Sequence, residues 1–83
     1  MYTLVYRRKE TESNNVYKSA FTRGDFRLKK NALHFLWEVI ENEYREEGYA
    51  TEKRVGGLYC YKSNKNAQGE RKIIEEWIKV EKY

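Results

Sequence analysis

The chain contains no proline, a single cysteine and a single histidine among its 83 residues. One cysteine cannot form a disulfide within the chain, so the core has to hold without covalent cross-links. One cysteine and one histidine also supply too few soft ligands for a structural zinc site. We therefore predict a protein that needs neither a metal nor a cofactor.

Long apolar runs are missing as well. Residues 31–37 form the longest uncharged stretch in the middle of the chain, far short of the ~20 apolar residues that a membrane helix needs. The chain reaches Arg7 and Arg8 after only a few apolar residues, and no apolar region with a secretory cleavage site is present there. These absences predict a cytoplasmic protein with no membrane partner.

Apolar residues are still plentiful, at 40% of the chain against 36% charged residues and a net charge of +4. This apolar share is too large for a disordered segment. A chain of this length cannot divide its apolar residues between two cores. We therefore expect residues 1–83 to form one domain.

Residues that could perform catalysis are scarce. A catalytic nucleophile needs a base that a third group holds against it, and His34 is the only histidine. Cys60 alternates with tyrosines, which is typical of a small buried side chain on a strand. The pair Gly56-Gly57 lacks both the further glycine and the lysine of a phosphate-binding loop. We predict that the protein is not an enzyme and has no catalytic residues.

Two regions have the composition of β-hairpins. Residues 3–8 and 16–22 are rich in Val, Tyr, Phe and Thr, and a polar stretch with turn residues separates them. Further along, residues 49–55 and 58–62 flank Gly56-Gly57, a dipeptide that suits a two-residue turn. In that register Arg54 faces Tyr59.

The strongest periodicity runs through residues 26–47 and predicts an amphipathic helix. Asp25 is its expected N-cap and Gly48 its expected end. On a helical wheel the apolar side chains fall within about 200°, with Phe35 and Trp37 at the two edges of the arc. The predicted apolar arc contains Leu28, Ala32, Leu33, Phe35, Leu36, Trp37, Val39, Ile40 and Tyr44, while Arg27, Asn31, His34, Glu38, Glu41, Asn42 and Arg45 face solvent.

Residues 71–80 are ambiguous, because their apolar side chains fit a helix but also fit one side of a strand as Ile74, Ile78 and Val80. We favour the strand, since Ile, Trp and Val suit a pleated surface and the preceding loop has the length of a hairpin loop. The predicted order is ββαβββ. It describes an α+β domain in which one long amphipathic helix packs on one face of an antiparallel sheet.

Charge along the chain is uneven, with basic residues concentrated in 1–37 and 51–83 and acidic residues in 38–50. The predicted helix carries cations at its start and carboxylates at its end, opposite to what the helix dipole favours. Such exceptions to local rules are typical of functional surfaces. An alternative is that charges on sheet loops offset this cost and that both edge rings cover the rim of the sheet. The predicted partner-binding residues are Arg23, Arg27, Lys29, Lys30, Phe35 and Trp37.

The sheet face away from the helix is a second candidate site. Arg54, Tyr59 and Tyr61 project to one side of the second hairpin. The first strand adds Arg7 together with Val5, or else Tyr6 with Arg8, depending on which of its sides faces out. Rings interleaved with cations can stack on bases and hold phosphates, although the same composition also occurs on ordinary solvated sheet faces. The alternative nucleic-acid-binding residues are therefore Arg7, Arg54, Tyr59 and Tyr61.

Taken together, these patterns predict a small non-enzymatic domain that binds a protein partner. We expect an acidic or nucleic-acid-binding surface on that partner, a larger host protein or complex. Accessory proteins and inhibitors from viruses and mobile elements have this size and type. The alternative function is binding of RNA or single-stranded DNA by the sheet face. Open sheet edges would also allow a homodimer.

Overall fold

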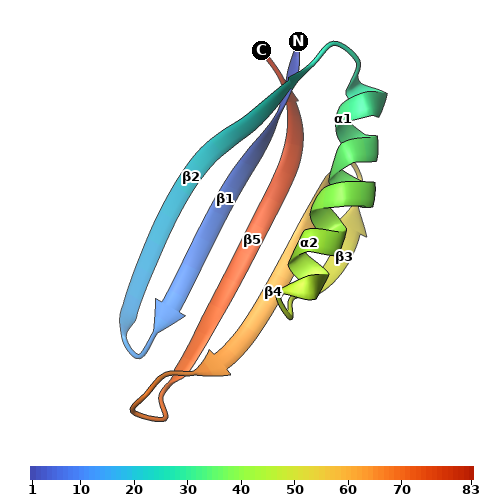
Figure 1. Ribbon diagram of the computed structural model, residues 1–83. Helices are drawn as coiled ribbons and strands as arrows, with labels where there is room; N and C mark the ends of the chain where they lie inside the picture. Colours follow the sequence, from blue (N-terminus) through green and yellow to red (C-terminus); the bar gives the residue numbers. More distant parts are fainter.

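The structure, a computed structural model that describes residues 1–83, is a five-stranded antiparallel sheet with one helix across one face (Figure 1). The predicted element order and α+β class are confirmed, and the ambiguous last segment is a strand. The strands are β1 (Tyr2–Glu12), β2 (Asn15–Phe26), β3 (Ala50–Arg54), β4 (Gly57–Lys65) and β5 (Arg71–Lys82), and the helix runs through α1 (Lys29–Phe35), η1 (Leu36–Ile40) and α2 (Glu41–Glu46).

The sheet order is β2-β1-β5-β4-β3, so the first and last strands of the chain are neighbours at its centre. The helix connects one edge strand, β2, to the other, β3, and therefore crosses the face of the sheet (Figure 1). The first hairpin is longer than predicted, because its strands pair as far as Glu12 and Asn15 around a two-residue turn.

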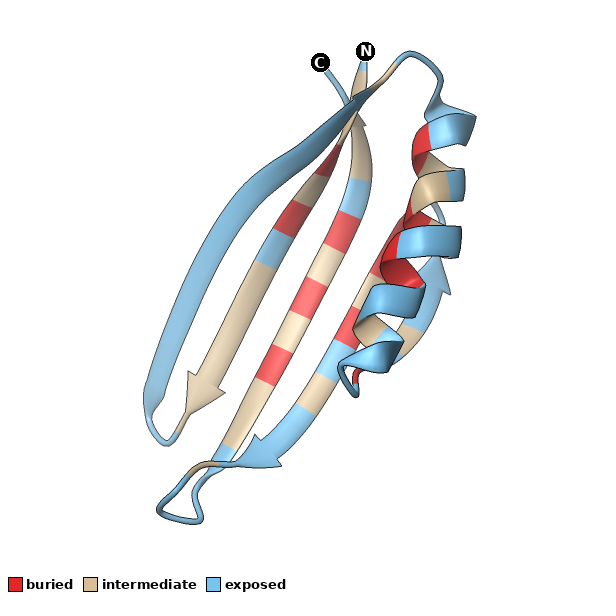
Figure 2. Cartoon of the chain, in the orientation of Figure 1, coloured by how far each residue is buried: buried red, intermediate tan, exposed pale blue.

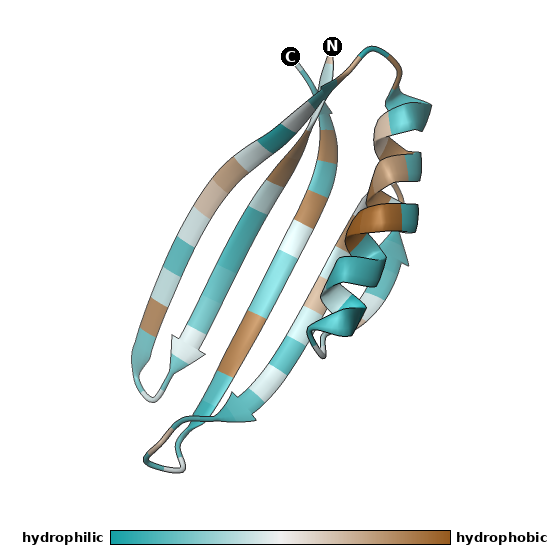
Figure 3. Ribbon diagram, in the orientation of Figure 1, coloured by the Kyte–Doolittle hydropathy of each residue, from teal (hydrophilic) through white to brown (hydrophobic).

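The core lies between the helix and the three central strands. Buried residues alternate with more exposed ones along β5, and β2 is exposed over almost its whole length (Figure 2). The apolar positions on the helix gather on the side that faces the sheet (Figure 3). None of the helical segments has the length and apolar character that crossing a membrane requires. The buried core residues are Leu4, Tyr6, Ala32, Leu36, Ile40, Tyr49, Leu58, Cys60, Ile74 and Ile78.

The helix widens to a π turn over η1, and this turn corrects the predicted helical wheel. A π turn contains more residues per turn than an α-helix, so it keeps Leu36 and Ile40 on the core side and rotates the positions around them. Val39 was expected in the core and is 40% exposed, whereas Glu41 was expected in solvent and is 4% exposed. The wheel is wrong at these two residues because it assumes a single period along the helix. It is also wrong at Leu28, which precedes the first helical residue and is 50% exposed.

The predicted start of the helix is also wrong, since it begins at Lys29 rather than at residue 26. Strand β2 continues to Phe26 past a bulge at Gly24, where φ is +81° and a Cβ atom would stand 2.8 Å from the Phe26 ring. Asp25 is a strand residue, not an N-cap, and its carboxylate accepts a hydrogen bond from the Tyr83 hydroxyl. No side chain caps the helix.

The second hairpin turns one residue earlier than predicted, at Val55 and Gly56. Gly56 supplies the positive φ, +69°, while Gly57 is buried as the first residue of β4. A Cβ atom on Gly57 would lie 2.5 Å from a carbonyl oxygen of β5. Arg54 therefore pairs with Gly57 rather than with Tyr59, a shift of two residues that leaves each side chain on its predicted face.

We expect Ile40→Ala to lower the free energy of unfolding by about 2–5 kcal/mol, because it leaves a cavity in the core. Val39→Ala should change it by less than about 0.5 kcal/mol, since Val39 points into solvent. Urea denaturation followed by circular dichroism measures both values. Similar losses in the two variants would contradict the π turn.

Cys60 should be unreactive in the folded protein. Burial, together with the neighbouring carboxylates of Glu76 and Glu41, raises the pKa of its thiol to about 12. The thiolate is the reactive form, so a disulfide reagent at about pH 8 should modify the native chain far more slowly than the urea-unfolded chain. Equal rates in the two states would refute the burial of this thiol.

Candidate functional site

The sheet has one face under the helix and one face away from it, which we call the open face. Side chains alternate between the faces along each strand, and the strand register decides which ones meet. Trp77 on β5 lies directly between Arg7 on β1 and Tyr59 on β4, and all three belong to the open face. The first strand therefore contributes Arg7 to this face, while Tyr6 and Arg8 lie on the helix side.

A groove of about 520 Å³ runs along the open face over β1 and β2. Its charged side chains are all cationic, and Trp77 forms its aromatic border. Lys9 and Lys18 stand directly opposite each other on the two strands, an arrangement that like charges normally disfavour. Neither lysine takes part in an ion pair, although Lys9 has Glu75 as its other cross-strand neighbour. The groove thus presents positive charge that the chain does not neutralise.

The aromatic side chains next to the groove are held in place. The Tyr59 and Trp77 ring centroids are 5.6 Å apart at an interplanar angle of 47°, and the Arg54 guanidinium lies 4.5 Å above the Tyr59 ring. The Tyr59 hydroxyl donates a hydrogen bond of 2.8 Å to Glu75 Oε2. Burial, together with the hydrogen bond to Glu75, raises the pKa of Tyr59 to about 12.

The four residues of the predicted nucleic-acid set lie on the open face, but not as one cluster. Arg7 is 3.6 Å from Glu81, and Arg54 is 3.6 Å from Glu52, so a carboxylate accompanies each guanidinium. Tyr61 is 37% exposed, toward the β3 edge. The strongest concentration of unpaired charge instead lies at the other end of the face.

Sequence reasoning missed Lys9, Lys18 and Trp77. A signal for Trp77 was present, because Ile74 and Ile78 on one side of a strand place residue 77 on the other side. No comparable signal marks the two lysines, which become neighbours only through the register of the first hairpin.

The two rings of the predicted partner-binding set are engaged within the chain. Trp37 is half-buried against the core, and its Nε1 donates a hydrogen bond of 2.9 Å to the Gly57 carbonyl oxygen. The Phe35 ring centroid lies 5.7 Å from that of Phe26 and 5.5 Å from the Arg23 guanidinium. These rings join the helix to the sheet.

The cations at the start of the helix are free, by contrast. Arg27, Lys29 and Lys30 are exposed and form no ion pair, and the first turn contains no acidic residue. Leu28 among them is 50% exposed. We call residues 27–30 the basic start. Arg23 differs from its predicted companions, because it pairs with Glu43 at 3.5 Å.

Comparisons with known proteins find no family model, no curated protein and no solved structure that matches this chain. Within the structure, no group of three or more His, Cys, Asp or Glu side chains stands close enough to hold a metal ion. What the chain binds therefore has to be inferred from the open face, the basic start and the cavities.

Stability should fall as the pH rises above about 10. Burial raises the pKa of Tyr6, Tyr44, Tyr49 and Tyr59 above the ordinary value of 10.0, so the folded chain keeps phenolic protons that the unfolded chain releases. This contribution is complete below pH 10 and is lost as the pH passes through the folded values, about 12 for Tyr59. Urea denaturation at several pH values checks it, and Tyr59→Phe should weaken the dependence. A flat profile in this range would contradict the burial of these hydroxyls.

Proposed function

We propose that this chain is a small binding domain that holds single-stranded nucleic acid on its open face. The observation that supports the proposal is the groove beside Trp77, whose lining contains no acidic side chain and in which Lys9 and Lys18 form no ion pair; Arg7 adds a guanidinium that is 3.6 Å from Glu81. Cations of this kind neutralise phosphates, and an aromatic ring stacks on a base. The groove combines both contacts on one surface.

The shape of the open face favours a single strand over a duplex. Its rings belong to a sheet surface, and an aromatic side chain stacks on a base only when that base is unstacked from its neighbours. Reading a B-form duplex requires an element that enters a groove, such as a helix or a protruding ribbon. The helix of this chain packs on the opposite face of the sheet (Figure 1). An extended strand lying across β1, β5 and β2 fits the surface better.

Binding to a fluorescently labelled oligonucleotide, measured by anisotropy at several salt concentrations, tests this function. Three phosphates neutralised on a single strand give a slope of about −2 in log K against log salt. The double variant Lys9→Gln, Lys18→Gln should reduce that slope by about 1.4. Trp77→Ala should weaken binding by about 5- to 150-fold through the loss of one stacked base.

A matched control is available at the basic start. The double variant Lys29→Gln, Lys30→Gln removes the same charge from another part of the surface and should leave both affinity and slope unchanged. Equal effects of the two double variants would show unspecific attraction by a protein of net charge +4 and would defeat the proposal. Absence of binding by the wild type at low salt would do the same.

The basic start supports a second candidate function, docking on a protein partner. Three unpaired cations surround an exposed leucine there, which is a surface that an acidic partner with an apolar contact point would match. Such a chain would act as a non-enzymatic accessory protein or inhibitor, of the kind that viruses and mobile elements encode. Phe35 and Trp37 would then position the helix rather than contact the partner.

The two candidates differ in which variants weaken binding. A protein partner at the basic start should lose affinity on Lys29→Glu and Lys30→Glu and be unaffected by Lys9→Gln and Lys18→Gln. Hydrogen exchange in the complex should then show protection around residues 27–30. Protection confined to β1 and β5 would exclude the basic start as the docking site.

A further inference from the structure

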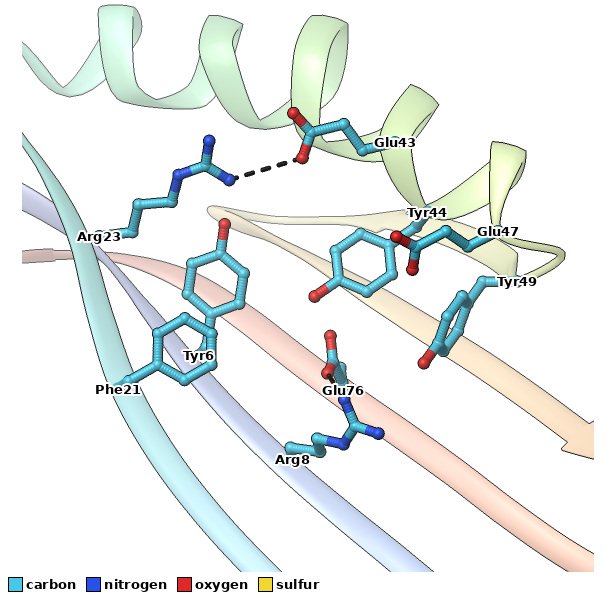
Figure 4. A pocket seen from close by; sticks show the side chains of 9 residues that line it. All are labelled: Tyr6, Arg8, Phe21, Arg23, Glu43, Tyr44, Glu47, Tyr49 and Glu76. Carbon is cyan, nitrogen blue, oxygen red and sulfur yellow. Dashed lines mark hydrogen bonds and ion pairs between the residues drawn. The ribbon is translucent and has the colours of Figure 1, made fainter.

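A cavity of about 180 Å³ separates α2 from the sheet on the helix side, away from the open face (Figure 4). It has the size of cavities that hold a benzene-sized group. The sheet contributes its floor through Tyr6 and Glu76, the helix contributes Tyr44, and Glu47 and Tyr49 come just after the helix. The cavity shares only Arg8 with the groove on the open face, and it shares no residue with the basic start.

The carboxylate of Glu76 is the unusual group in the cavity. Its side chain is 3% exposed, and Oε1 accepts a hydrogen bond of 3.2 Å from Arg8. Neither Oε2 nor the buried hydroxyl of Tyr6 has a hydrogen-bond partner at ordinary distance, although the Tyr6 hydroxyl faces the Arg23 guanidinium, which lowers the Tyr6 pKa against the larger effect of burial. Buried polar atoms without partners are costly, so two of them facing one cavity indicate a place for a ligand that donates hydrogen bonds.

Aromatic rings form the walls around these acceptors. The Tyr44 and Tyr49 centroids are 5.0 Å apart at 84°, and Tyr6 stacks on Phe21 at 4.5 Å. In Figure 4 the Tyr44 hydroxyl points toward Glu76. Burial raises the pKa of Tyr44, and the Glu76 carboxylate raises it further, so this side chain stays a neutral phenol. Rings with a carboxylate at the base of the site are typical of sites that hold an organic cation.

The charges around the cavity favour a cation over an anion. Arg8 is already bound by Glu10 and Glu76, and Arg23 is bound by Glu43. The Arg8 guanidinium is therefore occupied by carboxylates of the chain itself, while Arg23 is only weakly paired with Glu43 and also faces the Tyr6 hydroxyl. Two carboxylates in the cavity can still accept hydrogen bonds from a ligand. They are Glu76, through Oε2, and Glu47, which forms no ion pair.

The geometry points to a binding site for a primary ammonium group on an aliphatic stem, whose ammonium donates to Glu76 Oε2 and to the tyrosine hydroxyl oxygens. An ammonium has three donors and fits a compact site, and the rings accommodate the methylene groups beside it. The ammonium comes either from a small free amine or from a lysine side chain of another polypeptide.

Arg23 and Glu43 lie across the cavity from β2 to α2 (Figure 4). Their contact of 3.5 Å joins two side chains that are 46% and 48% exposed, so the pair is weak and can open. A bound ammonium and the Arg23 guanidinium are attracted to the same carboxylates of the cavity and repel each other. Removing the charge of Arg23 should therefore strengthen binding, the opposite of what removing the charge of Glu76 should do.

Titration of the ¹⁵N-labelled protein with n-butylammonium chloride tests the site, with n-butanol as the uncharged probe of the same shape. We expect saturable shifts of the amide signals around Glu76 and Tyr44 with the ammonium only. Glu76→Gln should lower the affinity about tenfold or more, and Arg23→Gln should raise it by up to about fivefold. Glu75→Gln is the matched control, because it makes the same change one residue away on the open face and should have no effect.

Three results would overturn the inference: no saturable shift with butylammonium, equal binding of butanol, or equal affinities of the Glu76→Gln and wild-type proteins. If Glu76→Gln fails to fold by circular dichroism, the exposed Glu47→Gln variant and the opposite response of Arg23→Gln decide the question. Nα-acetyl-lysine methylamide distinguishes the two sources. Binding as tight as that of butylammonium assigns the site to a lysine side chain, and much weaker binding assigns it to a free amine.

Discussion

The pairing of β1 with β5 is the contact on which the rest of the structure depends. These strands come from the two ends of the sequence and pair antiparallel over their whole length at the centre of the sheet. Their register places Tyr6 beside Ile78 under the helix and Arg7 beside Trp77 on the open face. If the strand register shifted by one residue, the side chains of the core and those of the open face would change places. The same backbone hydrogen bonds therefore determine both the core and the candidate groove.

This pairing also places paired, partly buried charges under the helix and unpaired cations on the open face. Under the helix, Arg8 is held between Glu10 and Glu76, because buried charges are costly without partners. On the open face, Lys9 and Lys18 stay unpaired, since water screens them. The free charge of the groove is therefore positive, while the free acceptors of the cavity are carboxylate and hydroxyl oxygens. The two sites suit ligands of opposite charge.

The π turn in the helix connects the fold to the cavity. By adding a residue to one turn, it carries Glu41 to the sheet side and leads into α2, which supplies Tyr44 to the cavity wall and is followed directly by Glu47. Insertions of this kind often occur at functional sites of helices.

Local patterns in the sequence were sufficient to predict the hairpins, the helix and the α+β order, because alternation, helical period and turn residues act between near neighbours. The same patterns put Arg54, Tyr59 and Tyr61 on one side of a hairpin. Only the tertiary structure brought Lys18 beside Lys9, turned Val39 outward and left Glu76 facing a cavity. Those arrangements depend on strand register and on the packing of the helix against distant strands. Such long-range contacts leave no periodic trace in the sequence of the segments they join.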